Sequence, residues 1–240
     1  MPDAIFADPR LARIYDPLDP DRGDLDAYAA MVAEFSARRV LDVGCGTGTF
    51  ACLLAARGVE VVGVDPAEAS LDVARGKCGA VRWIHGDATT LPPLRMDLAV
   101  MTANVAQVFL TDDDWQATLR GVRAALRPEG VLAFETRVPA RRAWLEWTRD
   151  RTRRRVEIGG VGEVETWCEV LDVSGPLVTF RHTYVFGDGG DVVTSDSTLR
   201  FRERDEVERS LVAAGYRVED VRDAPDRPGR EFVFVARFVA

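Results

Sequence analysis

Hydrophobic residues follow two different patterns along this 240-residue chain, and the pattern changes after Thr136. Before Thr136, short apolar runs alternate with longer amphipathic stretches. The apolar runs predict strands that are buried on both faces, at residues 39–43, 59–65, 80–87, 96–103 and 131–136. The amphipathic stretches predict helices at residues 27–35, 49–57, 67–75 and 112–126. Strands and helices that alternate at this spacing predict βαβ units around a parallel sheet.

The residues that flank these segments are typical of helix ends. Asp24 precedes the first predicted helix, and Thr111 or Asp112 precedes the last one, as N-cap residues. Gly58 follows the second helix, where glycine commonly ends a helix. Residues 127–130, with the sequence RPEG, are expected to separate the last helix from the fifth strand.

Beyond Thr136, apolar and polar residues alternate one by one. Residues 139–150 first predict a helix. Four alternating segments follow, at residues 153–158, 162–173, 177–186 and 191–201, with turn signals at 159–160, 174–175 and 187–190. This alternation with hairpin turns predicts an antiparallel sheet that has one face in water. We interpret residues 151–201 as a β insertion within a single domain of residues 1–240. The chain closes with a helix and two strands, at residues 204–214, 216–223 and 230–239.

Composition narrows the class of protein. With 47% hydrophobic and 29% charged residues, the chain can bury a substantial core. Its net charge of −8 disfavours a broad nucleic-acid surface. No apolar run approaches the roughly 20 residues of a membrane helix, and the N-terminal residues lack the apolar stretch of a signal peptide. We therefore expect a cytoplasmic protein that has no membrane partner, and nucleic acid is disfavoured as a partner.

Two groups of residues have plain structural explanations. The four cysteines show no paired spacing and no neighbouring histidine. They therefore predict free thiols, with no disulfide framework and no metal site. The arginine-rich run at residues 149–155 could bind phosphate or nucleic acid. It contains no aromatic residue, so a solvated edge strand is the favoured interpretation.

Three glycines follow the first predicted strand, in the sequence VLDVGCGTGTF at residues 40–50. Gly44, Gly46 and Gly48 lie at a strand-to-helix turn, where a ligand would meet bare backbone and the positive end of a helix. A dinucleotide-binding fingerprint would place its third glycine at position 49. This chain has Thr49 there, so its GxGxG spacing disfavours NAD and FAD.

Carboxylates stand at the ends of the first three predicted strands. Asp42 precedes the glycine turn, where a carboxylate repels a pyrophosphate and attracts an ammonium group. Asp65 can accept two hydrogen bonds from a ribose diol; alternatively, Asp65 and Pro66 only cap the next helix. Asp87 and the Ala88 amide can bind adenine, or they form a surface turn. Together with the glycine turn, Asp65 indicates a nucleoside ligand.

These segments together resemble the class I S-adenosylmethionine-dependent methyltransferases. The sequence LDVGCGTG matches the first motif of that family, and VVGVDPAEASLDVAR resembles its acidic second-strand loop. GDATTLP resembles its adenine-contacting turn, and LRPEGVLAFE its entry to the fifth strand. The resemblance covers residues 40–135, and the end of the chain fits the family's closing reversed hairpin. It implies an α/β, Rossmann-like sheet with helices on both faces, an enzyme that transfers a methyl group, and S-adenosyl-L-methionine as the cofactor.

The resemblance also implies which residues bind this cofactor. Its methionine portion would lie on the glycine turn with the ammonium group at Asp42, the ribose at Asp65 and the adenine at Asp87. Tyr15 could close over the cofactor from an N-terminal helical cover, or it belongs to the core. The complete predicted set is Asp42, Gly44, Gly46, Thr47, Gly48, Asp65, Pro66, Asp87, Ala88, Thr102, Asn104 and Tyr15.

The acceptor is expected at the carboxyl ends of the strands. Asn104 and Gln107 follow the fourth strand and could line its pocket, although Asn104 could instead cap a helix. Glu135 and Arg137 follow the fifth strand and could hold a polar acceptor or form a surface ion pair. His182 is a candidate general base or a structural histidine of the predicted insertion. Glu135, Arg137 and His182 are therefore candidates, and no catalytic residue is assigned.

The predicted insertion bears on the acceptor. Such a sheet resembles the insertions of some small-molecule methyltransferases, including aminosugar N-methyltransferases, which implies a small-molecule acceptor methylated on N or O, with an amine favoured. We expect Trp167, His182 and Tyr184 on one face, where aromatic rings would roof the acceptor pocket. Alternatively, the sheet joins a homodimer. The alternative functions are RNA or protein methylation, and a non-catalytic module that binds the cofactor and regulates a partner.

Overall fold

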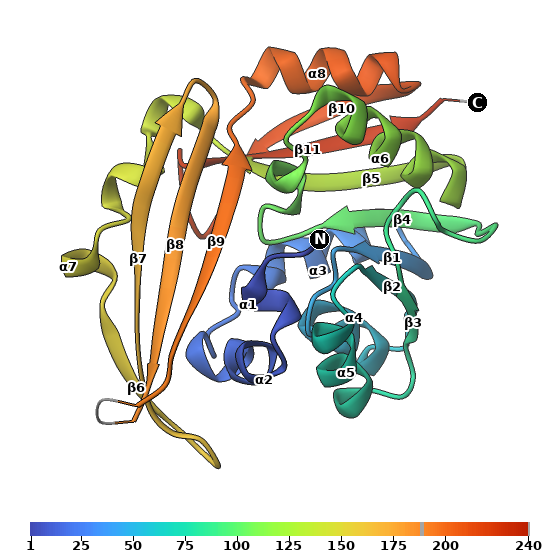
Figure 1. The fold of residues 1–240 in the computed structure, drawn as a ribbon. Helices are drawn as coiled ribbons and strands as arrows, with labels where there is room; N and C mark the ends of the chain where they lie inside the picture. Colours follow the sequence, from blue (N-terminus) through green and yellow to red (C-terminus); the bar gives the residue numbers. More distant parts are fainter. Residues whose placement is uncertain (188–189, 240) are drawn as a thin grey trace.

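A seven-stranded mixed sheet forms the centre of the molecule (Figure 1). In this computed structural model, which describes residues 1–187 and 190–239, the strand order is β10-β11-β5-β4-β1-β2-β3. The strands from β5 to β3 are parallel, whereas β11 is antiparallel to both β5 and β10. Their bounds are β1 (Arg39–Val43), β2 (Glu60–Asp65), β3 (Arg82–His85), β4 (Met96–Met101), β5 (Leu126–Arg137), β10 (Tyr216–Asp223) and β11 (Glu231–Phe238).

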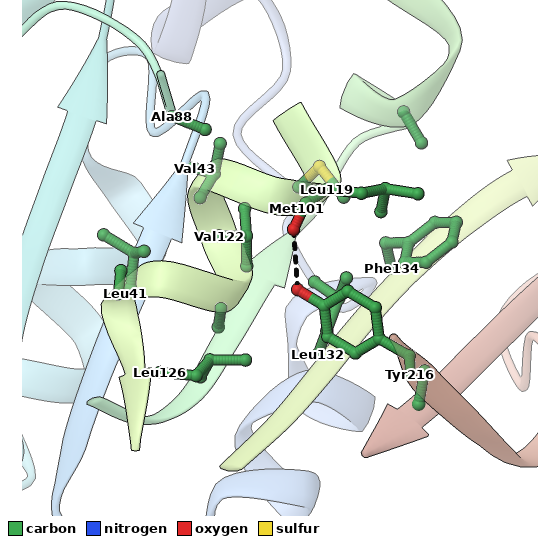
Figure 2. Close-up of a cluster of buried hydrophobic side chains, with 14 of the residues drawn as sticks. Leu41, Val43, Ala88, Met101, Leu119, Val122, Leu126, Leu132, Phe134 and Tyr216 are labelled. Atoms are coloured by element: carbon green, nitrogen blue, oxygen red, sulfur yellow. Dashed lines mark hydrogen bonds between the residues drawn. The ribbon is translucent and has the colours of Figure 1, made fainter. Parts of the chain in front are cut away.

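Helices cover both faces of this sheet. One face packs on α3 and α4, the other on α6 and α8, and α5 contacts β2 and β3. Their bounds are α3 (Leu25–Glu34), α4 (Thr49–Ala56), α5 (Glu68–Lys77), α6 (Asp112–Ala125) and α8 (Arg204–Ala213). Figure 2 shows the core around α6, where the Tyr216 hydroxyl donates a hydrogen bond to the Leu119 carbonyl at 2.9 Å. The predicted Rossmann-like fold, with helices on both faces, is confirmed. No helix in the described part of the chain is long and apolar enough to cross a membrane.

Most predicted helix and strand boundaries are within two residues of the observed ones, but three local predictions are wrong. Asp24 does not cap α3, because its carboxylate accepts both hydrogen bonds of the Arg22 guanidinium. Residues 127–130 do not precede the fifth strand; they lie inside β5, where an irregular register against β4 accommodates them. Residues 139–150 are not one helix. They form the short turns η2 (Pro139–Arg141) and η3 (Ala143–Glu146) and the start of α7 (Arg149–Thr152), because Arg142 has a φ of +46°.

The predicted antiparallel insertion is present as a four-stranded sheet of order β6-β7-β8-β9. Its strands are β6 (Arg154–Ile158), β7 (Gly162–Ser174), β8 (Leu177–Phe186) and β9 (Val192–Arg200). Residues 188 and 189 of the turn predicted at 187–190 lie outside the described residues. In Figure 1 this sheet stands beside the main sheet, and the N-terminal helices α1 (Ala4–Ala7) and α2 (Pro9–Leu18) contact its inner face. That residues 1–240 form a single domain stays a prediction.

A bulge in β7 decides which side chains reach that inner face. Next to the β7–β8 turn, Ser174 pairs with Leu177, and this register would place Trp167 opposite Tyr184. The register shifts between Val170 and Asp172, so Trp167 instead pairs with Thr183. Residues that face each other in an antiparallel pair lie on the same face of the sheet, and a slip of one residue exchanges the faces. The prediction that Trp167 shares a face with His182 and Tyr184 is therefore wrong.

The inner face is apolar beside α2, and the outer face is polar. Tyr184 is only 3% exposed and packs with Leu11 and Ile14 of α2, so it belongs to a core cluster and does not line an open pocket. On the outer face, the Arg149 guanidinium lies 4.2 Å from the centre of the Trp167 ring. Several charged residues of the outer side form ion pairs, namely Arg153–Glu165, Arg155–Glu163 and Arg181–Asp196. The arginine-rich run therefore includes part of the solvated edge strand β6, as predicted. A homodimer stays a prediction.

Replacing Tyr184 with alanine should lower the free energy of unfolding by about 3 kcal/mol, because it empties a buried aromatic site between the small sheet and α2. Replacing Trp167 with alanine should cost about 1 kcal/mol or less, since it lies on the outer face. Urea denaturation of the two variants measures the difference. Equal losses would contradict the assignment of the two faces.

Candidate active site

The glycine turn joins β1 to α4 and lies against the end of β2. The backbone amides of Gly44 and Cys45 donate to the carbonyl of Val64 at 2.8 and 3.2 Å. The Asp65 carboxylate accepts from the amides of Gly46 and Ala67, both at 2.8 Å. Asp65 thus ties the turn after β1 to the turn after β2. The bond to Ala67 is a local turn contact and not a helix cap, because Ala67 is itself the N-cap residue of α5 and that helix has no side-chain cap hydrogen bond. The ribose contact stays a prediction.

The three glycines of the turn face different surroundings. All have positive φ, at +71° for Gly44, +52° for Gly46 and +79° for Gly48. A Cβ atom on Gly44 would lie 2.7 Å from the Val105 side chain, and one on Gly48 would lie 2.4 Å from the Trp83 ring. A Cβ atom on Gly46 would meet no heavy atom within 4 Å. Of the three, Gly46 is therefore the one that leaves space for a ligand, whereas Gly44 and Gly48 permit close packing.

Asp42 lies beneath this turn as a buried carboxylate that lacks a full set of partners. It is 1% exposed, and its Oδ1 atom has no hydrogen-bond partner among the described residues. Burial, and then the nearby charge of Asp65, raise the pKa of Asp42 to about 7. A buried polar atom without a partner is costly. Oδ1 of Asp42 and the open space at Gly46 therefore fit a ligand that brings an ammonium group to this turn.

Hydrogen bonds hold the N-terminal helix α2 over the same turn. Asp16 accepts hydrogen bonds from the hydroxyls of Thr47 and Thr49, at 2.6 and 3.1 Å, and from Nζ of Lys77 at 2.6 Å. Tyr15, on the same helix, lines the adjoining cavity. The predicted helical cover is thus present, while the contact of Tyr15 with a cofactor stays a prediction.

A cavity of about 380 Å³ opens beside the turn, at the carboxyl ends of β4 and β5. Its charged lining is mostly acidic. The acidic residues are Asp16, Asp19, Asp21, Asp24, Glu135, Asp226 and Glu231, and the basic residues are Arg22, Arg137 and Arg227. None of the described residues of β6 to β9 is among the lining. Opposite charge attracts most strongly where water is partly excluded, so this cavity favours a cationic group.

Glu135 is held deep in this cavity. It is 8% exposed and accepts hydrogen bonds from the Tyr28 hydroxyl at 2.8 Å and from the backbone amide of Asn104 at 3.1 Å. Burial, and then the charge of Glu231, raise the pKa of Glu135 to about 7. Asn104 donates from its side chain to Glu231 at 3.1 Å, and it does not cap the turn η1 (Val105–Val108). The cap interpretation of Asn104 is therefore wrong. Asn104 lines the cavity, and its contact with an acceptor or a cofactor stays a prediction.

Arg137 is partly buried, and it forms no ion pair with Glu135, contrary to one of the sequence interpretations. Its backbone amide and Nη1 donate to Oε1 of Gln107, at 3.4 and 3.0 Å. The guanidinium lies 5.5 Å from the centre of the Trp147 ring. Burial lowers the pKa of Arg137. Gln107 therefore orients Arg137 and does not itself line the cavity.

The other predicted residues lie outside this cavity. His182 packs between the rings of Phe180 and Tyr184, and burial lowers its pKa to about 4. Asp87 is exposed, and its carboxylate accepts hydrogen bonds from the backbone amide and the hydroxyl of Thr89, as in the surface-turn interpretation. Ala88 and Thr102 are buried, and Pro66 is exposed. The predicted contacts of these three residues with the cofactor stay predictions.

Sequence reasoning missed several residues of the site, and Glu231 and Asp16 show why. Glu231 begins β11 and pairs with Arg137 across the sheet. The predicted closing hairpin was the only signal for it, because the register of that strand is not visible in the sequence. Asp16 was missed because its partners lie in the glycine turn and at the last residue of α5, far along the chain.

Comparisons with known proteins agree with this geometry. The family model described as "Methyltransferase domain" matches residues 40–130. These residues contain the glycine turn, Asp42 and Asp65. Residues 40–130 therefore contain a methyltransferase domain. The resemblance predicted from the motifs is thereby confirmed.

Individual relatives differ in how much of this chain they match. Demethylmenaquinone methyltransferase of Deinococcus radiodurans is 48% identical over 123 residues, which are 49% of this chain and 50% of the relative. Malonyl-[acyl-carrier protein] O-methyltransferase of Serratia marcescens is 27% identical over 206 residues, which are 80% of this chain and 74% of the relative. The chain spans about half the length of several curated relatives that it matches.

A solved structure extends the likeness in fold over nearly the whole chain. CalS10, an amino pentose methyltransferase from Micromonospora echinaspora with S-adenosylmethionine bound, superimposes with a TM-score of 0.72. The match covers 93% of this chain and 96% of CalS10, at 24% sequence identity. At this identity the likeness shows the shared fold. A match of this extent also reaches into the small antiparallel sheet.

Proposed function

We propose that this chain is an S-adenosylmethionine-dependent methyltransferase that methylates an amine nitrogen of a small molecule. The observation that carries the proposal is the acidic cavity beside the glycine turn, with seven carboxylates and three arginines in its lining. A protonated amine is the acceptor group that such a cavity attracts most strongly. The amino pentose methyltransferase, which shares the fold, supports the same choice.

The residues of the glycine turn would hold the cofactor. Asp42 would receive its ammonium group, Gly46 would lie against its methionine portion, and Asp65 would accept from its ribose. When bound, S-adenosylmethionine supplies a methyl group that is already activated by its sulfonium centre. The protein then has to align the acceptor and exclude water, and such alignment contributes up to about 7–11 kcal/mol in favourable cases.

Glu135 would prepare the acceptor. An ammonium group has no free electron pair, so the bound amine must first lose a proton, and the Glu135 carboxylate can accept it. Tyr28 and Asn104 hold that carboxylate in place. With the cofactor held at Asp42, Gly46 and Asp65, its sulfonium centre would supply the methyl group, and Glu135 would leave the amine nitrogen with the free electron pair that receives it.

Transfer to a panel of small amines should become faster as the pH rises from 6 to 8. Because the pKa of Glu135 is raised to about 7, the residue is protonated below that pH and accepts a proton above it. The variant Glu135→Gln should lower kcat/KM at pH 8 by about 100-fold, the lower range for a lost general base. His182→Gln, which lies outside the cavity, should leave kcat/KM unchanged. Release of S-adenosylhomocysteine measures the rate, and transfer to hydroxyl or carboxyl acceptors alone would contradict the proposal.

A further inference from the structure

Arg137 differs from the other two arginines of the cavity. Arg22 forms an ion pair with Asp24 at 2.9 Å, and Arg227 forms one with Glu231 at 3.0 Å. Among the described residues, Arg137 has no carboxylate within the 4.0 Å of a salt bridge, although Glu135 and Glu231 lie near it. A charge that has lost part of its hydration is stabilised by an oppositely charged partner. The cavity thus holds one cation whose pairing is incomplete.

The guanidinium of Arg137 is nevertheless held in a fixed orientation. Gln107 is fully buried and binds Nη1 of Arg137 through its Oε1 atom, while its own amide donates to the Arg200 carbonyl at 3.4 Å. The ring of Trp147 lies beside the guanidinium. Nη1 is therefore occupied, and no bond within the described residues uses Nε or Nη2. A guanidinium with one free edge is suited to a carboxylate or a phosphate, which it binds through two parallel hydrogen bonds.

We propose that Arg137 binds an anionic group of the methyl acceptor, so that the acceptor is an amine that also carries a phosphate or a carboxylate. This inference rests on the proposed function. Glu135 and Arg137 are separated by one residue on β5 and therefore lie on the same face of the strand, about 6.6 Å apart along it. The acceptor would place its amine at Glu135 and its anionic group at Arg137, in the same cavity.

The order of the strands separates Arg137 from the cofactor residues. β4 lies between β5, which carries Arg137, and β1, which leads into the glycine turn. Two strand spacings amount to about 10 Å. The carboxylate of a cofactor bound at Asp42 and Gly46 would therefore be closer to the cover formed by α2 than to Arg137. An anion at Arg137 is thus assigned to the acceptor.

Matched pairs of amines test this assignment. Ethanolamine is compared with phosphoethanolamine, and glucosamine with glucosamine 6-phosphate, by calorimetry on the full chain loaded with S-adenosylhomocysteine. For at least one pair, the phosphorylated member should bind the wild-type protein at least tenfold more tightly than its partner. Arg137→Gln should remove that difference. Arg141→Gln, an exposed arginine that donates to the Gly229 carbonyl, is the matched control and should retain it.

Three outcomes would overturn the inference. They are equal or absent binding of both members in both pairs, a preference for phosphate that survives Arg137→Gln, and a loss of S-adenosylhomocysteine affinity in Arg137→Gln without any effect on the amines. Failure of the proposed function gives a different result. In that case the wild-type chain does not bind S-adenosylhomocysteine, or it binds the compound and transfers no methyl group to amines of either kind.

Discussion

Replacing Asp42 with asparagine should weaken the binding of S-adenosylhomocysteine by about 100-fold and, at pH 8, make the protein more stable. The loss of affinity is expected because a buried carboxylate would no longer face the ammonium group, and removing one partner of such a pair costs about 2–5 kcal/mol. The gain in stability is expected because asparagine has a similar shape but no charge to desolvate. Calorimetry measures the affinity, and urea denaturation measures the stability.

The raised pKa of Asp42 determines how the stability of the protein changes with pH. In the folded protein the pKa of Asp42 is about 7, above its ordinary value of 3.8. The native state therefore holds its proton more tightly than the unfolded chain, and stability is lost as the pH rises from about 4 to about 7. Affinity for S-adenosylhomocysteine should rise over the same interval. Asp42→Asn should flatten both curves.

Asp97 provides a matched control on β4. Although its partial burial raises the pKa, hydrogen bonds from Arg127 and from the amides of Arg38 and Arg39 lower it to about 2. Asp97→Asn should therefore destabilise the protein at neutral pH and leave the affinity unchanged. If Asp42→Asn also destabilised the protein and left the affinity unchanged, Asp42 would be a structural residue only.

Replacing Gly48 with alanine should lower the free energy of unfolding by about 3 kcal/mol. The φ of +79° costs a residue with a Cβ atom about 1–2 kcal/mol, and the new methyl group would lie 2.4 Å from the Trp83 ring and 2.9 Å from Ala74. Overpacking of this kind typically costs about 1–3 kcal/mol more. Thermal or urea denaturation measures the loss.

Two other glycines separate the effect of packing from that of the ligand. Gly46→Ala and Gly58→Ala place a methyl group in open space at positive φ, so each should cost about 1 kcal/mol of stability. Gly46→Ala should also weaken S-adenosylhomocysteine binding, whereas Gly58→Ala should not. Equal stability losses at Gly46 and Gly48 would refute the packing explanation.

The parts of the site that are local in sequence could be predicted from it. Asp42, the glycine turn and Asp65 belong to one strand–helix–strand unit, so their spacing alone brings them together at the ends of β1 and β2. The parallel strands were equally visible, because strands buried on both faces are apolar at nearly every position.

The parts that depend on register could not be predicted. The hydrogen bond between Asn104 and Glu231 joins residues that are 127 positions apart, and it exists only because β11 pairs with β5 in one particular register. The same limit explains the error at Trp167, since period-two alternation reveals that a strand has two faces but not where one residue is skipped.

Because β7 contains a bulge, the deletion of a single residue there would change which side chains the sheet buries. Leu171 is the residue that has no partner between the Val170–Phe180 and Asp172–Thr179 pairs. If that residue were lost while the turn stayed in place, every β7 side chain before it would change faces. Thr166 and Cys168 would then point to water, and Glu165 and Glu169 would be driven against the buried face of β8. The number of residues in this strand therefore decides which of its side chains are buried.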